Sequence, residues 1–275
     1  MIKYIISISD THVRNYKRMN ETTEFFTRFI EYCKDFTLEH NPEEVRIVIA
    51  GDLFDQKISA SNESKIMVAW LLRELNEIAK TYVICGNHDY LMNNVDRVCS
   101  LTPIFSMSQF DNCHYLDMDL GYISGIVEDD NVAWCLFSTF EDFNRPEIDI
   151  YKKQNPDKTL IGLIHADING AQTDVGRTSD TGLETTHFKN LDFVIAGHIH
   201  KRQEIKKKGV KIVYCGSLIQ QDMGENLSGH GGVIWNVEEK TWTPFDIDRG
   251  EYGYYKFVID NPDDIDNDNE KILNL

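Results

Sequence analysis

The stretch Gly86-Asn87-His88-Asp89 follows the apolar run Tyr82-Val83-Ile84-Cys85, which has the composition of a buried strand. A strand that ends in this way brings a neutral amide, an imidazole and a carboxylate to one edge of a sheet. Glycine allows the chain to turn sharply there without a Cβ clash. Open α/β sheets build their sites at such carboxyl ends of strands. The tetrapeptide alone is an ordinary polar turn, but four further strand ends have the same chemistry.

The composition is typical of a globular protein with one large core or a domain plus an appendage, since 41% of the 275 residues are hydrophobic. No apolar run approaches membrane-spanning length, so no membrane contact is expected. Residues 1–8 turn polar too soon for a signal peptide and are predicted to start the first strand. The six cysteines have no paired short spacing, which predicts buried reduced thiols and a cytoplasmic location.

The formal net charge of -17 argues against a generic nucleic-acid-coating protein. It does not exclude an enzyme that acts on nucleic acid, because metal cations can neutralise carboxylates in a site. Two local groups of basic residues follow candidate site motifs and are compatible with phosphate contact or with solvated loop tips. They are Arg14, Lys17 and Arg18, and then Lys201, Arg202, Lys206, Lys207, Lys208 and Lys211.

The first 110 residues alternate between strand and helix patterns, which predicts a parallel sheet with crossover helices. Strands are expected at 3–9, 45–50 and 82–85, and helices at 20–38, 61–80 and 95–110, with Asn20 as the first N-cap, Ile66 facing inward and a break near Pro103. The later chain is predicted as short strands at 113–117, 122–127, 132–137, 158–164 and 191–196, hairpins at 203–214 and 233–245, and a last strand at 252–259. A long polar loop at 166–186 and an acidic tail at 261–275 complete the pattern.

Five of the predicted strands end in carboxylate, amide or imidazole groups, and strands of one parallel sheet deliver such ends to one edge. The groups are Asp10 and His12; Asp52 and Asp55; Asn87, His88 and Asp89; His165; and His198 and His200. Oxygen and imidazole ligands suit Mn, Fe or Zn. Even seven ligands from this set would be too many for one tetrahedral metal and would suit two metals bridged by a carboxylate.

Each motif also has a structural interpretation. The turn at Asp10 can cap a helix, Gly51-Asp52 can form a β-turn, and His165 can be a hydrogen-bonded core histidine. His198 and His200 alternate as strand residues do, so both can face solvent. That all of these interpretations hold together, each at a strand end, is improbable as a coincidence.

The ordered motifs Asp-x-His, Gly-Asp-x-x-Asp, Gly-Asn-His-Asp, a lone histidine and Gly-His-x-His resemble the calcineurin-like metallophosphoesterase superfamily over residues 1–245. The resemblance implies an α/β fold, a β-sandwich of two mixed sheets flanked by helices, with a two-metal phosphoesterase centre. Residues 246–275 would then hold a last strand and an acidic tail, the start of a truncated or reduced capping region.

The resemblance also implies the role of each site residue. Asp10, His12, Asp52 and His200 would hold the first metal; Asp52, Asn87, His165 and His198 would hold the second. His88 would face the substrate phosphate, and the Asp55 carboxylate would orient it. The ligand set without thiolate makes Mn the first expectation, with Mg, Fe and Zn as alternatives.

Three features narrow the resemblance to the SbcD-type nuclease subunits of bacteria and phages. No Arg-Gly follows Gly51-Asp52, Asp89 replaces the glutamate of protein phosphatases, and residues 213–220 contain a tyrosine-x-Gly-Ser stretch. Such a relation implies a DNA exonuclease with single-strand endonuclease activity in an SbcCD-like repair or recombination complex, with an SbcC-like SMC-type ATPase partner. Its location would be the cytoplasm, or the host cytoplasm if a phage encodes it.

Two departures qualify that relation: about thirty residues follow Phe245, too few for a full capping domain, and Cys215 stands where the family often has proline. A homodimer through the helices flanking Gly86 is also expected, although the same residues can simply fill the core. These residues are Trp70, Leu72, Leu91, Met92, Val95, Val98, Leu101, Ile104 and Phe105.

The alternative function on the same centre is a small-molecule or cyclic-nucleotide phosphodiesterase or phosphatase. An open groove with basic rims would favour DNA, and a closed pocket covered by residues 166–186 would favour a small ester. A non-enzymatic scaffold is disfavoured because every ligand position is filled.

Overall fold

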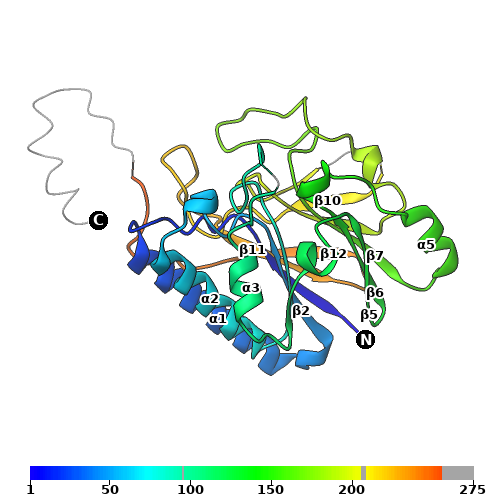
Figure 1. The fold of residues 1–275 in the computed structure, drawn as a ribbon, viewed down its shortest axis with the longest axis horizontal. Coiled ribbons are helices and arrows are strands. Elements are labelled where there is room, and N and C mark those ends of the chain that lie inside the picture. Colours follow the sequence, from blue (N-terminus) through cyan, green and yellow to red (C-terminus); the bar gives the residue numbers. More distant parts are fainter. Residues whose placement is uncertain (95, 206–208, 256–275) are drawn as a thin grey trace, which may run out of the picture.

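The computed structural model describes residues 1–94, 96–205 and 209–255. Its core consists of two six-stranded mixed sheets that pack on each other (Figure 1). The first sheet has the order β12 (Thr241–Asp246), β11 (Gly231–Asn236), β1 (Tyr4–Ile8), β2 (Val45–Ala50), β3 (Lys80–Ile84) and β4 (Cys113–Tyr115). The second has the order β5 (Gly125–Asp129), β6 (Val132–Phe137), β7 (Thr159–His165), β8 (Phe193–Gly197), β10 (Lys211–Tyr214) and β9 (Gln203–Ile205).

This architecture confirms the predicted α/β fold of two mixed sheets flanked by helices. β1, β2 and β3 run parallel, and α1 (Met19–Glu39) and α2 (Asn62–Asn76) form the crossovers between them. Both helices lie along one outer side of the sandwich (Figure 1). In the second sheet β6, β7, β8 and β10 are parallel, and β5 and β9 pair antiparallel at its two edges.

The central strands, such as β2 and β6, are buried on both faces, which explains their continuous apolar sequences. In β2, Ile47 and Ile49 join the core under the helices, whereas Val48 and Ala50 face the other sheet. Aromatic groups fill the space between the sheets, where the rings of Phe193 and Trp235 stack with centroids 4.0 Å apart.

The first two helices differ from their predictions at the ends. Arg18, in a left-handed conformation, is the N-cap of α1 in place of Asn20. Ser61 caps α2 by accepting a hydrogen bond from the Ser64 amide, but the helix ends at Asn76 because Lys80 already belongs to β3. Ile66, expected to face inward, is 69% exposed.

The predicted helix at 95–110 is reduced to α3 (Thr102–Met107), with Pro103 in its first turn. Proline is tolerated there because the first helical amides need no intrahelical acceptor. Two short helices were not predicted: α4 (Leu116–Asp119), in place of the end of a strand, and α5 (Ile148–Gln154), which packs on the second sheet through Ile148.

The last predicted strand is absent over residues 252–255, and its remainder and the acidic tail lie outside the described residues. All six cysteines are buried free thiols, as predicted. Within the described ranges, no helix has the length and apolar character needed to cross a bilayer.

Candidate metal centre

The polar strand ends gather at one end of the sandwich. The sequence predicted that they would belong to one parallel sheet, but they come from both sheets. β1, β2 and β3 lead into Asp10, Asp52 and Asn87. β7 ends at His165, and His198 follows β8 in the second sheet. The site is therefore built across the interface between the two sheets.

Three glycines leave the space in which these side chains meet. A Cβ on Gly86 would lie 2.1 Å from Asp52 Oδ1, and one on Gly51 would lie 2.4 Å from His165 Nδ1. A Cβ on Gly197 would lie 2.1 Å from the Ala50 oxygen. Glycine before each motif is thus needed for close approach of the strand ends.

Four predicted ligand residues have left-handed backbones, which is uncommon for residues other than glycine. The φ angles are 52° at Asp10, 44° at His12, 52° at Asp52 and 95° at His198. Such strain collects at functional sites because the surrounding structure must hold it in place. The backbone therefore supports a functional role for this cluster, independently of the side chains.

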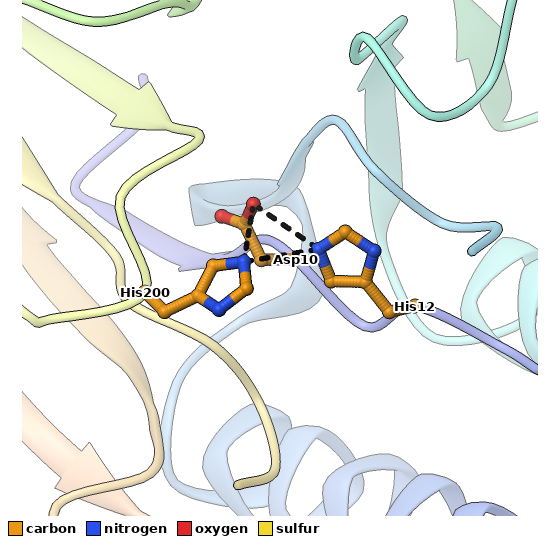
Figure 2. Close-up of side chains that lie close together, drawn as sticks. All are labelled: Asp10, His12 and His200. Carbon is orange, nitrogen blue, oxygen red and sulfur yellow. Dashed lines mark hydrogen bonds and ion pairs between the residues drawn. The ribbon is translucent and has the colours of Figure 1, made fainter. Parts of the chain in front are cut away.

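One group of converging side chains contains Asp10, His12 and His200, as Figure 2 shows. The Nε2 atoms of His12 and His200 lie 3.1 Å apart, and each is 3.7 Å from Asp10 Oδ1. His12 Nε2 is also 3.7 Å from Asp52 Oδ2. These are the four residues expected around the first metal.

A second group contains Asp52, His165 and His198. His165 Nε2 lies 3.1 Å from Asp52 Oδ2, and His198 Nδ1 lies 2.7 Å from Asn87 Oδ1. Asp52 Oδ1 accepts a hydrogen bond of 2.7 Å from the His88 amide. Asp52 therefore contacts both groups, which is the position expected of a bridging carboxylate.

The protonation equilibria reflect this crowding of carboxylates and imidazoles. Burial opposes charge on His165, but the Asp52 and Asp10 carboxylates outweigh it and raise the pKa of His165 to about 10. Burial likewise opposes charge on His200, yet Glu225 and Asp10 raise its pKa to about 9. Burial raises the pKa of Asp10, and the surrounding histidines lower it further than burial raises it.

The donor atoms fit a bound cation. His165 Nδ1 donates to the Ala50 carbonyl at 2.7 Å, so Nε2 is the nitrogen that would give up its proton and offer a lone pair when a cation binds. That Nε2 is buried and makes no hydrogen bond, although Asp52 Oδ2 lies 3.1 Å away. Buried polar atoms are almost always paired, and a metal ion would serve as the missing partner of such a nitrogen.

His88 and Asp55 lie beside the first group but contact each other differently from the expectation. His88 Nδ1 donates to the backbone oxygen of Asp55 at 2.8 Å. The Asp55 carboxylate instead lies 4.0 Å from His12 Nδ1 and accepts from Gln56 Nε2 at 2.7 Å. The backbone carbonyl of Asp55 therefore orients the His88 ring, whereas the sequence resemblance predicted that the Asp55 carboxylate would do so.

Two buried carboxylates support the site and had no role assigned from the sequence. Glu225, whose side chain is 6% exposed, accepts from His200 Nδ1 at 2.5 Å. Asp89 accepts from the Phe54 and Gly86 amides, both at 2.9 Å, and so joins two site loops. Asp89 could have been suspected because it ends the central motif, whereas Glu225 belongs to a loop without any recognisable pattern.

A family model described as calcineurin-like phosphoesterase matches residues 4–202. The chain belongs to the calcineurin-like phosphoesterase family. It is therefore a phosphoesterase of the metal-dependent class, and the family together with the two groups of side chains supports a dimetal centre. The sequence resemblance to this superfamily is confirmed; its closer relation to SbcD-type subunits stays a prediction.

Known proteins similar to this phosphoesterase include a viral one. The uncharacterized protein R555 of Acanthamoeba polyphaga mimivirus is 34% identical over 92% of this chain, which spans only 18% of that relative's length. A solved dimetal phosphatase from Danio rerio has a TM-score of 0.53 at 11% identity, covering 86% of this chain and 93% of its own. A solved archaeal phosphodiesterase has a TM-score of 0.39 at 14% identity, covering 88% and 98%.

Proposed function

We propose that this phosphoesterase is a phosphodiesterase that cleaves DNA, as an exonuclease with endonuclease activity on single strands. The observation that carries the proposal is an open cavity of about 280 Å³ beside the metal-type residues, adjoining a second of about 270 Å³. His198, His200 and Asp222 line both cavities. Two adjoining cavities leave room for groups on both sides of a phosphate, which a phosphodiester such as a DNA strand requires and a single phosphate group does not.

The proposed division of roles follows from the contacts in the site. Asp10, His12, Asp52 and His200 would hold one divalent cation, and Asp52, Asn87, His165 and His198 the second, with Mn²⁺ as the expected metal. When bound, such cations polarise the phosphate and lower the pKa of a water molecule.

His88 lines the first cavity. It forms a third cluster of metal-type side chains with His12 and Asp55, but it belongs to neither of the two ligand groups proposed above. Because its Nδ1 donates to the Asp55 carbonyl, Nε2 is the atom free to exchange a proton. In the proposed reaction a water molecule that gives up a proton to solvent would attack phosphorus opposite the leaving oxygen. The bond from phosphorus to that oxygen would break, and His88 would supply a proton to it.

A small-molecule or cyclic-nucleotide phosphodiesterase is the second candidate, and the charge of the walls favours it. Asp55, Asp174 and Asp222 line the two cavities and would repel a long polyanion. Several of the basic residues expected to meet DNA have internal partners: Arg18 pairs with Glu21, and Arg202 with Asp246. Lys206 to Lys208 lie outside the described residues.

Hydrolysis assays separate the two candidates. The protein would be offered an end-labelled duplex, the matching single strand, a cyclic nucleotide and bis-p-nitrophenyl phosphate, with Mn²⁺ and with chelator. We expect metal-dependent shortening of the labelled DNA. Efficient hydrolysis of the cyclic nucleotide with intact DNA would replace the first candidate by the second, and no hydrolysis of any diester would contradict both.

The proposal includes an SbcC-like ATPase partner, which rests on the resemblance, and a homodimer, which rests on the resemblance and on the apolar residues that flank Gly86. For the dimer, Met92 and Val98 are exposed and available, whereas Leu72 and Leu101 are fully buried within the chain. Light scattering at micromolar concentration should give the mass of two chains, and a monomer would contradict the dimer. Stimulation of DNA cleavage by such an ATPase and ATP tests the partner.

A further inference from the structure

Arg14 lies two residues beyond His12 and lines the cavity of the metal centre together with His88 and Asp55. Among the described residues around that cavity, it is the only lysine or arginine. Its side chain is 25% exposed, so it is neither a core residue nor a freely moving surface cation. The division of roles proposed above assigns it no function.

Two contacts hold the guanidinium in a fixed orientation. Nη2 donates to the Gln221 carbonyl at 2.8 Å, and Nη1 donates to the Tyr254 hydroxyl at 3.2 Å. Tyr254 is itself held, because its amide donates to Gln220 Oε1 at 2.7 Å and the Arg18 guanidinium lies 4.8 Å from its ring centroid. A guanidinium oriented in advance loses little conformational freedom when it binds an anion.

Of the N–H groups of Arg14 that these two contacts leave unused, the one on Nε has no acceptor. This nitrogen is buried without a hydrogen-bond partner, and the nearest carboxylate oxygen, Asp55 Oδ1, is 3.9 Å away. That distance is too long for a hydrogen bond. A buried donor without an acceptor is costly, and charge-assisted hydrogen bonds from arginine to phosphate are among the strong ones.

We propose that Arg14 is a substrate-binding residue that donates to a non-bridging oxygen of the substrate phosphate. The inference rests on the proposed function in taking a phosphate ester as the substrate. It also makes Tyr254 a positioning residue, although the sequence assigns it to a separate capping region. The final described segment of the chain is then part of the active site.

The test compares the full chain with R14M, Y254F and a matched control, R73M, which removes an exposed arginine from α2. Each Mn²⁺-loaded protein would be titrated calorimetrically with inorganic phosphate, and KM and kcat would be measured on bis-p-nitrophenyl phosphate. For R14M we expect phosphate affinity to fall and KM to rise by about 10- to 100-fold, the effect of one lost charge-assisted hydrogen bond. Bound Mn²⁺ and kcat should change little, and R73M should match the wild type.

Y254F removes only the hydroxyl that orients Arg14, so it should raise KM by a smaller factor and leave kcat unchanged. Unchanged phosphate affinity and KM in R14M would overturn the inference and leave Arg14 with a structural role. If R14M does not fold, Y254F decides by the same criterion. Phosphate binding is measured without turnover, so a wild type that binds phosphate but hydrolyses no diester would contradict the proposed function and not the role of Arg14.

Discussion

Two clusters of buried charge lie at opposite ends of the same strands. Only one of them is complete, in the sense that its polar groups satisfy one another's hydrogen bonds. At the start of β2, Arg46 donates to Asp129 through Nε at 2.6 Å and Nη2 at 3.2 Å. Tyr82 and Lys80 also donate to the Asp129 carboxylate, at 2.9 and 3.3 Å. Arg46 Nη1 reaches two backbone carbonyls, so this cluster satisfies its own hydrogen bonds.

At the other end of β2, Asp52 lies among imidazoles whose nitrogens face one another. His165 Nε2 and His12 Nδ1 are buried without hydrogen-bond partners, and four residues have left-handed backbones. Buried charge alone therefore does not mark a functional site in this protein. The mark is a cluster that lacks a partner and is held under strain, whereas the complete Asp129 cluster only joins the two sheets.

The largest expected effect comes from the bridging position. Asp52→Ala should abolish metal-dependent hydrolysis and lower the bound metal, because Asp52 contacts both groups of ligand-type residues. Activity assays and elemental analysis after Mn²⁺ loading would measure both. Full metal content with full loss of activity would show that Asp52 acts in chemistry and not as a ligand.

Replacing His88 should separate chemistry from metal binding. His88→Ala should keep the fold and both metals and lower kcat by about 10²- to 10⁴-fold, the range for losing a general acid. Release of a metal from this variant would make His88 a ligand, and full activity would move the proton donor to another group.

The complete cluster should respond in stability and not in activity. Asp129→Asn should lower the free energy of unfolding by about 3–5 kcal/mol, since it leaves Arg46 buried without its counter-charge. Metal content and kcat of the folded fraction should match the wild type. Urea denaturation monitored by tryptophan fluorescence measures this, and a loss of metal would remove the contrast between the two clusters.

Asp129→Asn should also change how the free energy of unfolding depends on pH in acid. Burial raises the pKa of Asp129, but Arg46 and Tyr82 outweigh it and lower the pKa to about 2, below the ordinary value of 3.8. The stabilisation is therefore complete above about pH 4 and is lost as the pH falls towards 2. Unfolding free energies of wild type and Asp129→Asn should converge over this window; a constant difference would argue against an ionised Asp129.

A smaller effect is expected from replacing Glu225, whose carboxylate accepts a hydrogen bond from His200 Nδ1. Glu225→Gln should weaken Mn²⁺ binding by about 10- to 100-fold, the usual effect of removing an outer-shell partner of a ligand. Calorimetric titration with Mn²⁺ measures it, with exposed Glu63 of α2 replaced by Gln as the control. Unchanged affinity would mean that His200 does not ligate or needs no support.

The sequence predicts those parts of the fold in which periodicity and burial agree. The strands at 45–50 and 132–137 match residue for residue because they are buried on both faces and bounded by polar turns. The helix predicted at 95–110 is mostly irregular, because no regular apolar stripe was available before Pro103 and Cys99 and Leu101 are buried individually.

The candidate site likewise has a part that the sequence predicts and a part that it does not. The motif residues converge as the strand ends predict, since chain direction fixes where each strand delivers its polar group. The contacts of Arg14 with Gln221 and Tyr254 span more than 200 residues, 207 and 240, and no local pattern encodes them. Likewise, that His88 meets the carbonyl of Asp55 and not its carboxylate depends on the exact path of a loop.

The central claim is that the incomplete cluster around Asp52 holds two metal ions. Anomalous scattering from crystals soaked in Mn²⁺ tests it most directly. The account predicts two peaks about 3.5–4 Å apart with Asp52 between them, the spacing of two-metal sites. One peak should lie beside Asp10, His12 and His200, and the other beside Asn87, His165 and His198. A single peak, or two peaks away from Asp52, would contradict it.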